Sequence, residues 1–355
     1  MVIGIDNSPL VSTHKLAHKI RGTGFYTRNL IDALVAYHPE NQYVLFQQGN
    51  LPKRKIDIFH YPYFDPFFLS LPFNKKGKTI VTIHDLTPLV FPRLFPVGVR
   101  GRVKYEIQKK LAKRTDAVIT DSDSSKKDIE RIMGMSPAKV FSIPLAAGEH
   151  FKKIDVARKI KDELLKKYDL PEKFALYVGD ATPNKNLPVL MDAIKIAQIP
   201  LVLVGGALAK QDVDYTHPWN RDIEYVQHAA RDNSSIKILG FVPDEDLVLL
   251  YNMAVVFVFP SVYEGFGLPV LEAASCGCPV ITTKGGSIPE VMGDAGIYIK
   301  PNDEQSLAQE ILSFFKDENK RLRYSKRGIL QSEKFSWKKT ADNTAKIYEK
   351  VYSEA

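Results

Sequence analysis

Short apolar runs alternate along the chain with longer segments that show helical spacing. The runs are rich in Val, Ile and Phe without polar alternation, which is typical of strands buried on both faces of a parallel sheet. Strands are predicted at residues 2–5, 43–46, 56–60, 79–83, 117–120, 174–178, 201–204, 236–239, 255–259 and 279–282, and the segment 140–144 closes the first domain. Helices are predicted at 26–36, 93–114, 126–133, 152–168 and 337–352, and from 188, 244, 269 and 288. The alternation continues through both halves without internal repeats, so it predicts an α/β protein of two doubly wound, Rossmann-like domains.

The stretch 255–281 joins an expected strand, a loop with two glycines and an expected helix. Gly265 and Gly267 allow a backbone to approach a ligand closely, and Pro269 suits the first turn of a helix. The N–H groups and positive dipole end of that helix favour a phosphate. The stretch therefore predicts an anion site between strand and helix.

Two carboxylates, Glu264 and Glu272, bracket this turn with seven residues between them. An acidic residue early in a helix is also ordinary helix-dipole chemistry, which is the simpler interpretation of Glu272. Glu264 lies in the loop, where that explanation does not apply. A carboxylate beside an anion site would repel the ligand unless the ligand carries hydroxyls or positive charge, so a phosphate joined to a sugar fits both features.

The segment Glu264-Gly-Phe-Gly-Leu-Pro-Val-Leu-Glu272-Ala resembles the Glu, seven residues, Glu signature of retaining glycosyltransferases with the GT-B fold, family 4. The resemblance implies two doubly wound domains facing across a cleft and a nucleotide-sugar donor at this motif. Glu272 would bind ribose hydroxyls, and Glu264 would bind sugar hydroxyls as a catalytic residue. The other donor-binding positions that it implies are Gly265, Phe266, Gly267, Leu268 and Val242.

Four further positions gain a role from the same resemblance. His84 ends an expected strand, where side chains face the ligand crevice, and the family places a His-Asp pair there beside the donor sugar. Lys185 precedes an expected helix and would meet the diphosphate; Asp180 stands where the family often has a basic residue, which leaves Lys185 as the main cation. Gly22 and Gly24 lie in a loop that the family directs toward the donor phosphates and the acceptor.

Several alternatives remain open. Gly22-Thr-Gly24 lacks the third glycine of a dinucleotide fingerprint, so a nicotinamide oxidoreductase is a weak alternative. Asp121-Ser-Asp123 resembles the metal motif of a different glycosyltransferase fold, although Asp and Ser before a helix are more simply capping residues. A GT-B sugar-nucleotide epimerase and an inactive nucleotide-sugar-binding protein share the expected fold.

The charge of the chain is concentrated in its first half. The 355 residues carry a formal charge of +8, and residues 1–150 hold 22 Lys and Arg against 13 Asp and Glu. Eight of the basic residues lie in 93–114, where Val99, Val103, Ile107 and Leu111 recur every four positions. Packing on the sheet is the default for such a helix, and its basic face can meet an anionic membrane, a phosphate-bearing substrate, nucleic acid or only water.

We expect a cytoplasmic enzyme that is peripheral on the membrane at most. The start of the chain lacks a basic leader and long apolar core, no run of about 18 apolar residues occurs, and Cys276 and Cys278 suit buried reduced thiols. The expected domains are 1–150, with a terminal helix at 338–355 packing back on it, and 151–337.

The expected reaction is metal-independent, retaining transfer of a sugar to a hydroxyl acceptor, a lipid-linked saccharide or polysaccharide intermediate. Mannose from GDP-mannose is the first expectation by subfamily likeness, with a UDP-sugar next. We expect no cofactor, no metal and no nucleic-acid partner.

Overall fold

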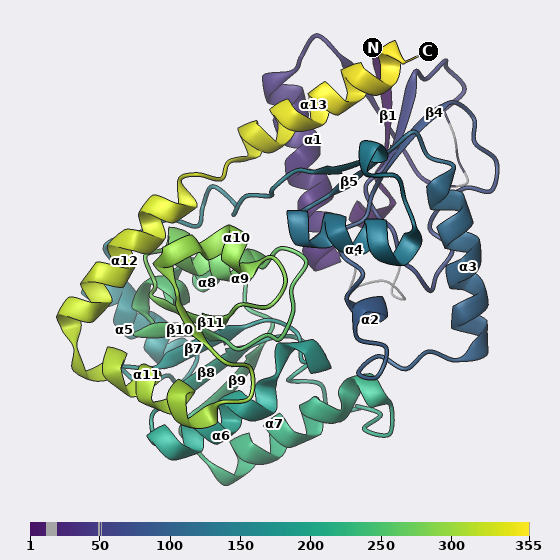
Figure 1. Cartoon of the computed structure of the whole chain (residues 1–355). Coiled ribbons are helices and arrows are strands. Elements are labelled where there is room, and N and C mark those ends of the chain that lie inside the picture. Colours follow the sequence, from purple (N-terminus) through teal and green to yellow (C-terminus); the bar gives the residue numbers. More distant parts are fainter. Residues whose placement is uncertain (12–19, 49, 51, 355) are drawn as a thin grey trace. The chain divides into compact units, whose positions relative to one another are not determined.

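The computed structural model describes residues 1–11, 20–48, 50 and 52–354, and it divides into two compact units (Figure 1). The first unit comprises Met1–Pro92, Pro96–Ala146 and Phe335–Ala355. The second comprises Arg93–Phe95 and Ala147–Lys334. Each unit has its own six-stranded parallel sheet with helices packed against it, which is the predicted fold class.

The sheet of the first unit has the strand order β2-β1-β3-β4-β5-β6. Its strands are β1 (Val2–Asp6), β2 (Gln42–Phe46), β3 (Ile58–Tyr61), β4 (Lys78–Thr82), β5 (Ala117–Thr120) and β6 (Val140–Ser142). Every residue of β3 and β5 is buried, as expected for strands covered on both faces. The carboxyl ends of β4 and β5 are adjacent, because Thr82 pairs with Ile119.

The helices of the first unit include one from the end of the chain. They are α1 (Phe25–Tyr37), α2 (Thr87–Val90), α3 (Val99–Lys113), α4 (Asp123–Met133) and α13 (Trp337–Ser353). The terminal helix α13 lies along α1 (Figure 1). It buries Trp337 and Tyr348, and Thr340 Oγ1 donates to the Pro144 carbonyl at 2.8 Å.

The sheet of the second unit has the strand order β12-β11-β10-β7-β8-β9. Its strands are β7 (Ala175–Val178), β8 (Leu201–Val204), β9 (Ile236–Gly240), β10 (Val256–Phe259), β11 (Val280–Thr283) and β12 (Ile297–Ile299). The strand order reverses between β7 and β10. In an open parallel sheet, the carboxyl ends of the strands at such a switch point form the ligand crevice.

Eight α-helices of the second unit fall within the described residues. They are α5 (Arg158–Lys167), α6 (Leu187–Ala197), α7 (Arg221–Asp232), α8 (Asp244–Met253), α9 (Leu268–Ser275), α10 (Ile288–Met292), α11 (Glu304–Lys316) and α12 (Glu318–Ser332). Both cysteines are buried and unpaired in this unit. None of the helices described in either unit is long and apolar enough to cross a membrane.

Two sequence-based expectations for the first unit need correction. Gly22 and Gly24 do not lie in an open loop, because Ile20–Gly24 forms a π-helical turn that continues into α1; residues 12–19 before it are outside the described part. The apolar stripe of α3 does not pack on the sheet along its whole length. Val99 and Val103 are 77% and 56% exposed, whereas Leu111 is buried, so only the second half of the helix contributes to the core.

Candidate active site

Two oppositely charged side chains meet at the switch point of the second sheet. Lys185 follows β7 and Glu264 follows β10, and Lys185 Nζ lies 2.8 Å from Glu264 Oε1 and 2.9 Å from Oε2. Only 16% of the Lys185 side chain and 11% of the Glu264 side chain are exposed. Adjacent parallel strands end at one edge of the sheet, so residues that are 79 positions apart in the sequence come into contact there.

Glu264 is held by its side chain and by its backbone. Ser261 Oγ donates to Glu264 Oε1, and Lys185 Nζ also lies 5.0 Å from the centroid of the Phe259 ring. The backbone N–H and Oγ of Ser287 both donate to the Glu264 carbonyl at 3.1 Å. These contacts come from the connections after β10 and β11 and fix the loop between Glu264 and α9.

Two glycines are required for this loop to close. Gly267 has a φ of +97°, and a Cβ atom there would lie 2.6 Å from Ile288 Cδ1. Gly286 has a φ of +62°, and a Cβ atom there would overlap the Glu264 carbonyl oxygen. Both positions combine left-handed backbone with a close approach, which only glycine tolerates.

Glu272 points to Tyr251 rather than to Glu264. It lies in α9, and Tyr251 OH, from α8, donates to Glu272 Oε2 at 3.1 Å. Burial raises the pKa of Glu272 to about 7, although the hydrogen bond from Tyr251 acts in the opposite direction; the charge of Asp244 adds to the rise. Near neutral pH both the charged and the neutral form of such a carboxyl are populated. A ligand that donates hydrogen bonds to the charged form stabilises that form.

The remaining donor-binding predictions divide between two places. Gly265, Phe266, Gly267 and Leu268 form the connection from Glu264 into the first turn of α9. In that turn Pro269 has no N–H, and the N–H groups of Val270 and Leu271 donate to the Gly267 carbonyl. Val242 is buried after β9, which β7 and β8 separate from β10, so it lies apart from Glu264. Asp180 is exposed directly after β7 and places negative charge near the switch point.

His84 lies in the first unit, after β4, with an acceptor at each ring nitrogen. Its Nδ1 lies 2.8 Å from Asp121 Oδ2, and its Nε2 lies 3.2 Å from the Pro62 carbonyl. A carbonyl can only accept, so both contacts are satisfied together by the doubly protonated ring. Burial lowers the pKa of His84, but the charge and hydrogen bond of Asp121, the charge of Asp85 and the Pro62 contact together leave the pKa raised.

The expected role of Asp121 as a helix cap is wrong. The cap of α4 is Ser122, whose side chain accepts from Ser125 N, while Asp121 is the ion-pair partner of His84. Asp123 lies in the first turn of α4 and accepts from Ser142 Oγ. Asp121 directly follows β5, the strand next to the one that His84 follows, so this contact depends on a strand order that the sequence pattern does not give.

The sequence pattern also missed the neutral partners of the site. Ser261, Tyr251 and Tyr26 each contact one of the predicted residues, and Tyr26 packs its ring against His84 with centroids 4.7 Å apart. Tyr26 is two residues after Gly24, so the glycine turn leads directly to the neighbourhood of His84.

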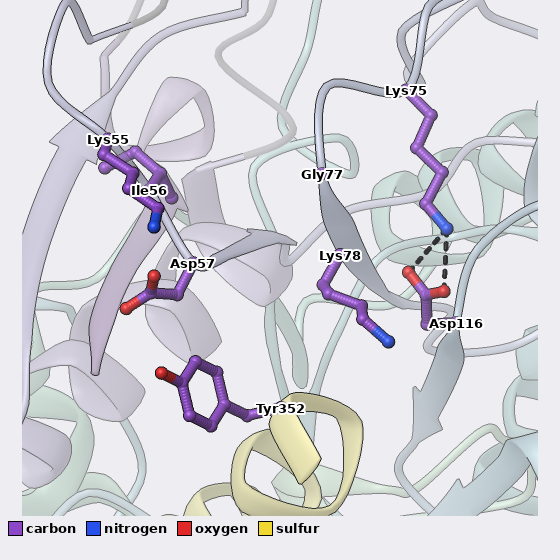
Figure 2. A pocket seen from close by; sticks show the side chains of 8 residues that line it. All are labelled: Lys55, Ile56, Asp57, Lys75, Gly77, Lys78, Asp116 and Tyr352. Carbon is purple, nitrogen blue, oxygen red and sulfur yellow. Dashed lines mark hydrogen bonds and ion pairs between the residues drawn. The ribbon is translucent and has the colours of Figure 1, made fainter. Parts of the chain in front are cut away.

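A separate hollow of about 570 Å³ lies at the opposite edge of the first sheet (Figure 2). Lys55 and Asp57 precede β3, Lys75 and Asp116 precede β4 and β5, and Tyr352 of α13 also lines it. Asp116 pairs with Lys75 at 2.7 Å, and Asp57 accepts from the Val2 N–H. Because the hollow lies at the amino ends of the strands, it is not part of the candidate site.

Two family models match the chain. Glycosyl transferases group 1 matches residues 160–331, and Glycosyltransferase Family 4 matches residues 20–146. Relatives include O-antigen chain mannosyltransferase B of Escherichia coli, 33% identical over 97% of this chain and 87% of that protein. The serotype-specific mannosyltransferase WbdA of Escherichia coli is 30% identical over 78% of this chain but only 34% of its own length.

Solved structures support the fold. Sucrose-phosphate synthase from Thermosynechococcus elongatus matches with a TM-score of 0.72 at 21% identity and covers 100% of both chains. Anabaena HepE in complex with UDP-glucose matches with a TM-score of 0.71 at 18% identity, over 98% of this chain and 99% of that one. The two doubly wound units and these neighbours show the GT-B fold, and the two family models define the class as glycosyltransferases. Within that class, the chain belongs to glycosyltransferase family 4.

Replacement of Gly286 tests how tightly the loop around Glu264 is built. Gly286→Ala should destabilise the protein by about 1–3 kcal/mol, because the methyl group meets a backbone oxygen and the backbone is left-handed. Urea unfolding gives the free energy. Gly296→Ala is the matched control in the same unit, since its Cβ atom would meet only ordinary contacts at 3.5 Å or more. Equal stability of the two variants would contradict the close approach.

Proposed function

We propose that this glycosyltransferase moves mannose from GDP-mannose to a hydroxyl of a lipid-linked saccharide, with retention of configuration and without a metal. The observation that carries the proposal is the Lys185–Glu264 pair beside the first turn of α9 at the switch point. The names of the Escherichia coli relatives support mannose, and HepE, whose structure contains UDP-glucose, makes a UDP-sugar the next choice.

Each group of the second unit has a proposed part in holding the donor. Glu272 accepts hydrogen bonds from ribose hydroxyls, and Glu264 accepts from sugar hydroxyls at oxygen positions that Lys185 and Ser261 leave open. The positive end of α9, with the Leu268 N–H at its start, and the Lys185 ammonium meet the diphosphate. Val242 lines the pocket for the base.

The proposed transfer needs no covalent enzyme intermediate. The bond between the sugar C1 atom and the diphosphate oxygen breaks while the acceptor oxygen bonds to C1 on the same face. The acceptor proton passes to the leaving diphosphate oxygen. Lys185 and the helix end stabilise the charge that grows on the diphosphate, and preorganised groups of this kind supply much of enzymatic rate enhancement. His84 donates from Nε2 to a sugar hydroxyl in place of the Pro62 carbonyl, which accepts that N–H in this structure.

The observed partners of Asp121 and Asp123 support the proposal that these two residues do not hold a metal. Asp121 is paired with His84, and Asp123 accepts from Ser142. In this proposal the Lys185 ammonium and the N-terminal end of α9 take the place of a metal at the diphosphate.

A basic and apolar surface of the first unit supports a membrane-bound acceptor. Phe68 and Leu69 are 58% and 43% exposed, and they lie beside α3, because Lys104 Nζ is 5.1 Å from the centroid of the Phe68 ring. Val99 and Val103 are exposed on α3 itself. The exposed basic residues around this surface are Arg100, Arg102, Lys110, Lys113 and Arg114. Exposed apolar side chains with a basic rim suit an anionic lipid surface.

A donor screen tests the reaction. Mass spectrometry of the purified enzyme with GDP-mannose and UDP-sugars, each with and without a saccharide acceptor, should show transfer from GDP-mannose that EDTA does not abolish. Turnover of the donor alone would favour an epimerase, and binding without turnover would favour an inactive nucleotide-sugar-binding protein. Loss of transfer in EDTA with recovery in manganese would reject the metal-free mechanism.

Glu272 should make nucleotide binding pH-dependent. The charged carboxylate is the better acceptor for ribose hydroxyls, so affinity for GDP should rise with pH through the Glu272 pKa of about 7. Calorimetry of Glu272→Gln should show weaker binding, and the titration of GDP itself is common to both proteins. Tyr251→Phe removes a contact that lowers this pKa and should move the midpoint to higher pH. Identical pH profiles for wild type and Glu272→Gln would reject the proposed contact between Glu272 and the ribose, and a helix-dipole role would not replace it, because Glu272 lies beyond the first turn of α9.

Liposome sedimentation tests the membrane surface. Each Lys or Arg near an anionic bilayer contributes about 1 kcal/mol, so changing Arg100, Arg102, Lys110 and Lys113 to Gln should reduce binding to phosphatidylglycerol vesicles more than about tenfold. Salt should weaken binding, because screening acts within about 10 Å at 0.1 M. Lys109 is not used, since its Nζ donates to the Ile132 carbonyl.

The control for that experiment changes Arg158, Lys159, Lys166 and Lys326 of the second unit to Gln. It removes the same number of charges from exposed positions elsewhere. An equal loss in both variants, or equal recovery on neutral vesicles, would leave the basic face solvated and favour a soluble acceptor.

A further inference from the structure

A chain of buried polar side chains connects α13 with His84 inside the first unit. Tyr348 OH lies 2.7 Å from His60 Nδ1, and His60 Nε2 lies 2.8 Å from Thr82 Oγ1. Thr82 Oγ1 lies 3.0 Å from Tyr26 OH. The Tyr26 ring then meets the His84 ring edge-on, at an interplanar angle of 84°. The terminal helix, β3, β4 and α1 each contribute to this chain.

These buried polar side chains would be an unfavourable choice if their only role were to fill the core. His60, Thr82 and Tyr348 are 0% exposed, and Tyr26 is 1% exposed. Polar groups buried this deeply are unfavourable unless each is hydrogen-bonded, whereas apolar residues of similar size would fill the same space. Burial, with a further contribution from the nearby His84, lowers the pKa of His60 to about 3, so the ring is neutral. A neutral imidazole donates from one nitrogen and accepts at the other, so one of its two neighbours must accept and the other must donate.

The geometry extends the function proposed for His84. We infer that Tyr348, His60, Thr82 and Tyr26 are positioning residues that hold the His84 ring in the orientation needed for sugar transfer. His84 is held by Asp121 and the Pro62 carbonyl through its nitrogens, and Tyr26 supports the ring from the side. Thr82 fixes the Tyr26 hydroxyl, and His60 and Tyr348 fix Thr82. The role of His84 in transfer rests on the proposed function.

The inference gives the C-terminal helix α13 a role at the candidate site. Tyr348 is 288 positions from His60 in the sequence, so α13 reaches the neighbourhood of His84 only through the folded first unit. The titratable groups that act on His84 are Asp121 and Asp85, with His60 nearby, whereas the Tyr26 hydroxyl is bonded to Thr82 and only the Tyr26 ring packs against His84. The Asp121 contact raises the pKa of His84, so a loosened ring should titrate at lower pH.

The test compares Thr82→Val with Thr82→Ser, and Tyr348→Phe with Tyr43→Phe. Val keeps the shape of Thr without its hydroxyl, and Ser keeps the hydroxyl. Tyr43, which is half-buried in the same unit, donates to the His38 carbonyl at 3.0 Å rather than to His60 or Thr82, so Tyr43→Phe controls for the loss of a tyrosine hydroxyl near Tyr348. Full-length proteins labelled with ¹⁵N-histidine are titrated by NMR, with the His84 signals assigned from His84→Gln. Transfer kinetics and thermal unfolding are measured on the same samples.

Thr82→Val and Tyr348→Phe should lower the pKa of His84 by about half a unit or more. They should also reduce kcat about tenfold with little change in KM for the donor, as expected for a misplaced catalytic group. Thr82→Ser and Tyr43→Phe should behave like the wild type in both measurements.

A purely structural role predicts a different result. Thr82→Val and Tyr348→Phe would then lower the melting temperature while the His84 pKa and kcat stay at their wild-type values, which would overturn the inference. Equal effects of Thr82→Ser and Thr82→Val would also overturn it. The NMR titration needs no substrate, so it decides the coupling even if His84→Gln keeps full transfer, a result that would reject only the proposed role of His84.

Discussion

The ion pair between Lys185 and Glu264 is the contact on which the second unit's site depends. A carboxylate that is 11% exposed is unfavourable without a cation, and removing one partner of such a pair leaves the other uncompensated. The pair forms only because β7 and β10 are neighbours at the point where the strand order reverses. Gly286 and Ser287 then close the loop over the Glu264 backbone. Sheet topology therefore fixes the charged centre, and the loop chemistry holds it in place.

Hydrophobic patterning predicted the sheets better than the outer helices. The strands at 117–120 and 201–204 were predicted with the observed bounds, because buried parallel strands are short apolar runs with polar neighbours. The helix α12 was not predicted. Gly328 is its only buried residue, so its face toward the core leaves almost no apolar periodicity in the sequence. The three-residue strand β12 is too short to stand out from its surroundings.

Local motifs predicted the candidate site residues but not the side chains that contact them. Glu264 and Glu272 follow from one segment, whereas Glu264 is paired with Lys185 and Glu272 is bonded to Tyr251, from other elements. Asp121 was expected to cap a helix, since capping needs only local sequence. Its pairing with His84 depends on β4 and β5 lying side by side, and strand order is not encoded in the spacing of apolar residues.

The two halves of the chain differ in charge, and the proposed donor and the proposed acceptor call for different charge. Residues 151–355 hold 27 Lys and Arg against 28 Asp and Glu, and Lys185 is already neutralised by Glu264. A diphosphate would thus be recognised by the N-terminal end of α9 and by one shared ammonium, rather than by a strong positive field. The excess of basic residues in the first 150 positions is not needed for the donor. It has a role if the other partner is a large anionic surface, which is why exposed Val99 and Val103 among those charges favour the membrane over a small soluble anion.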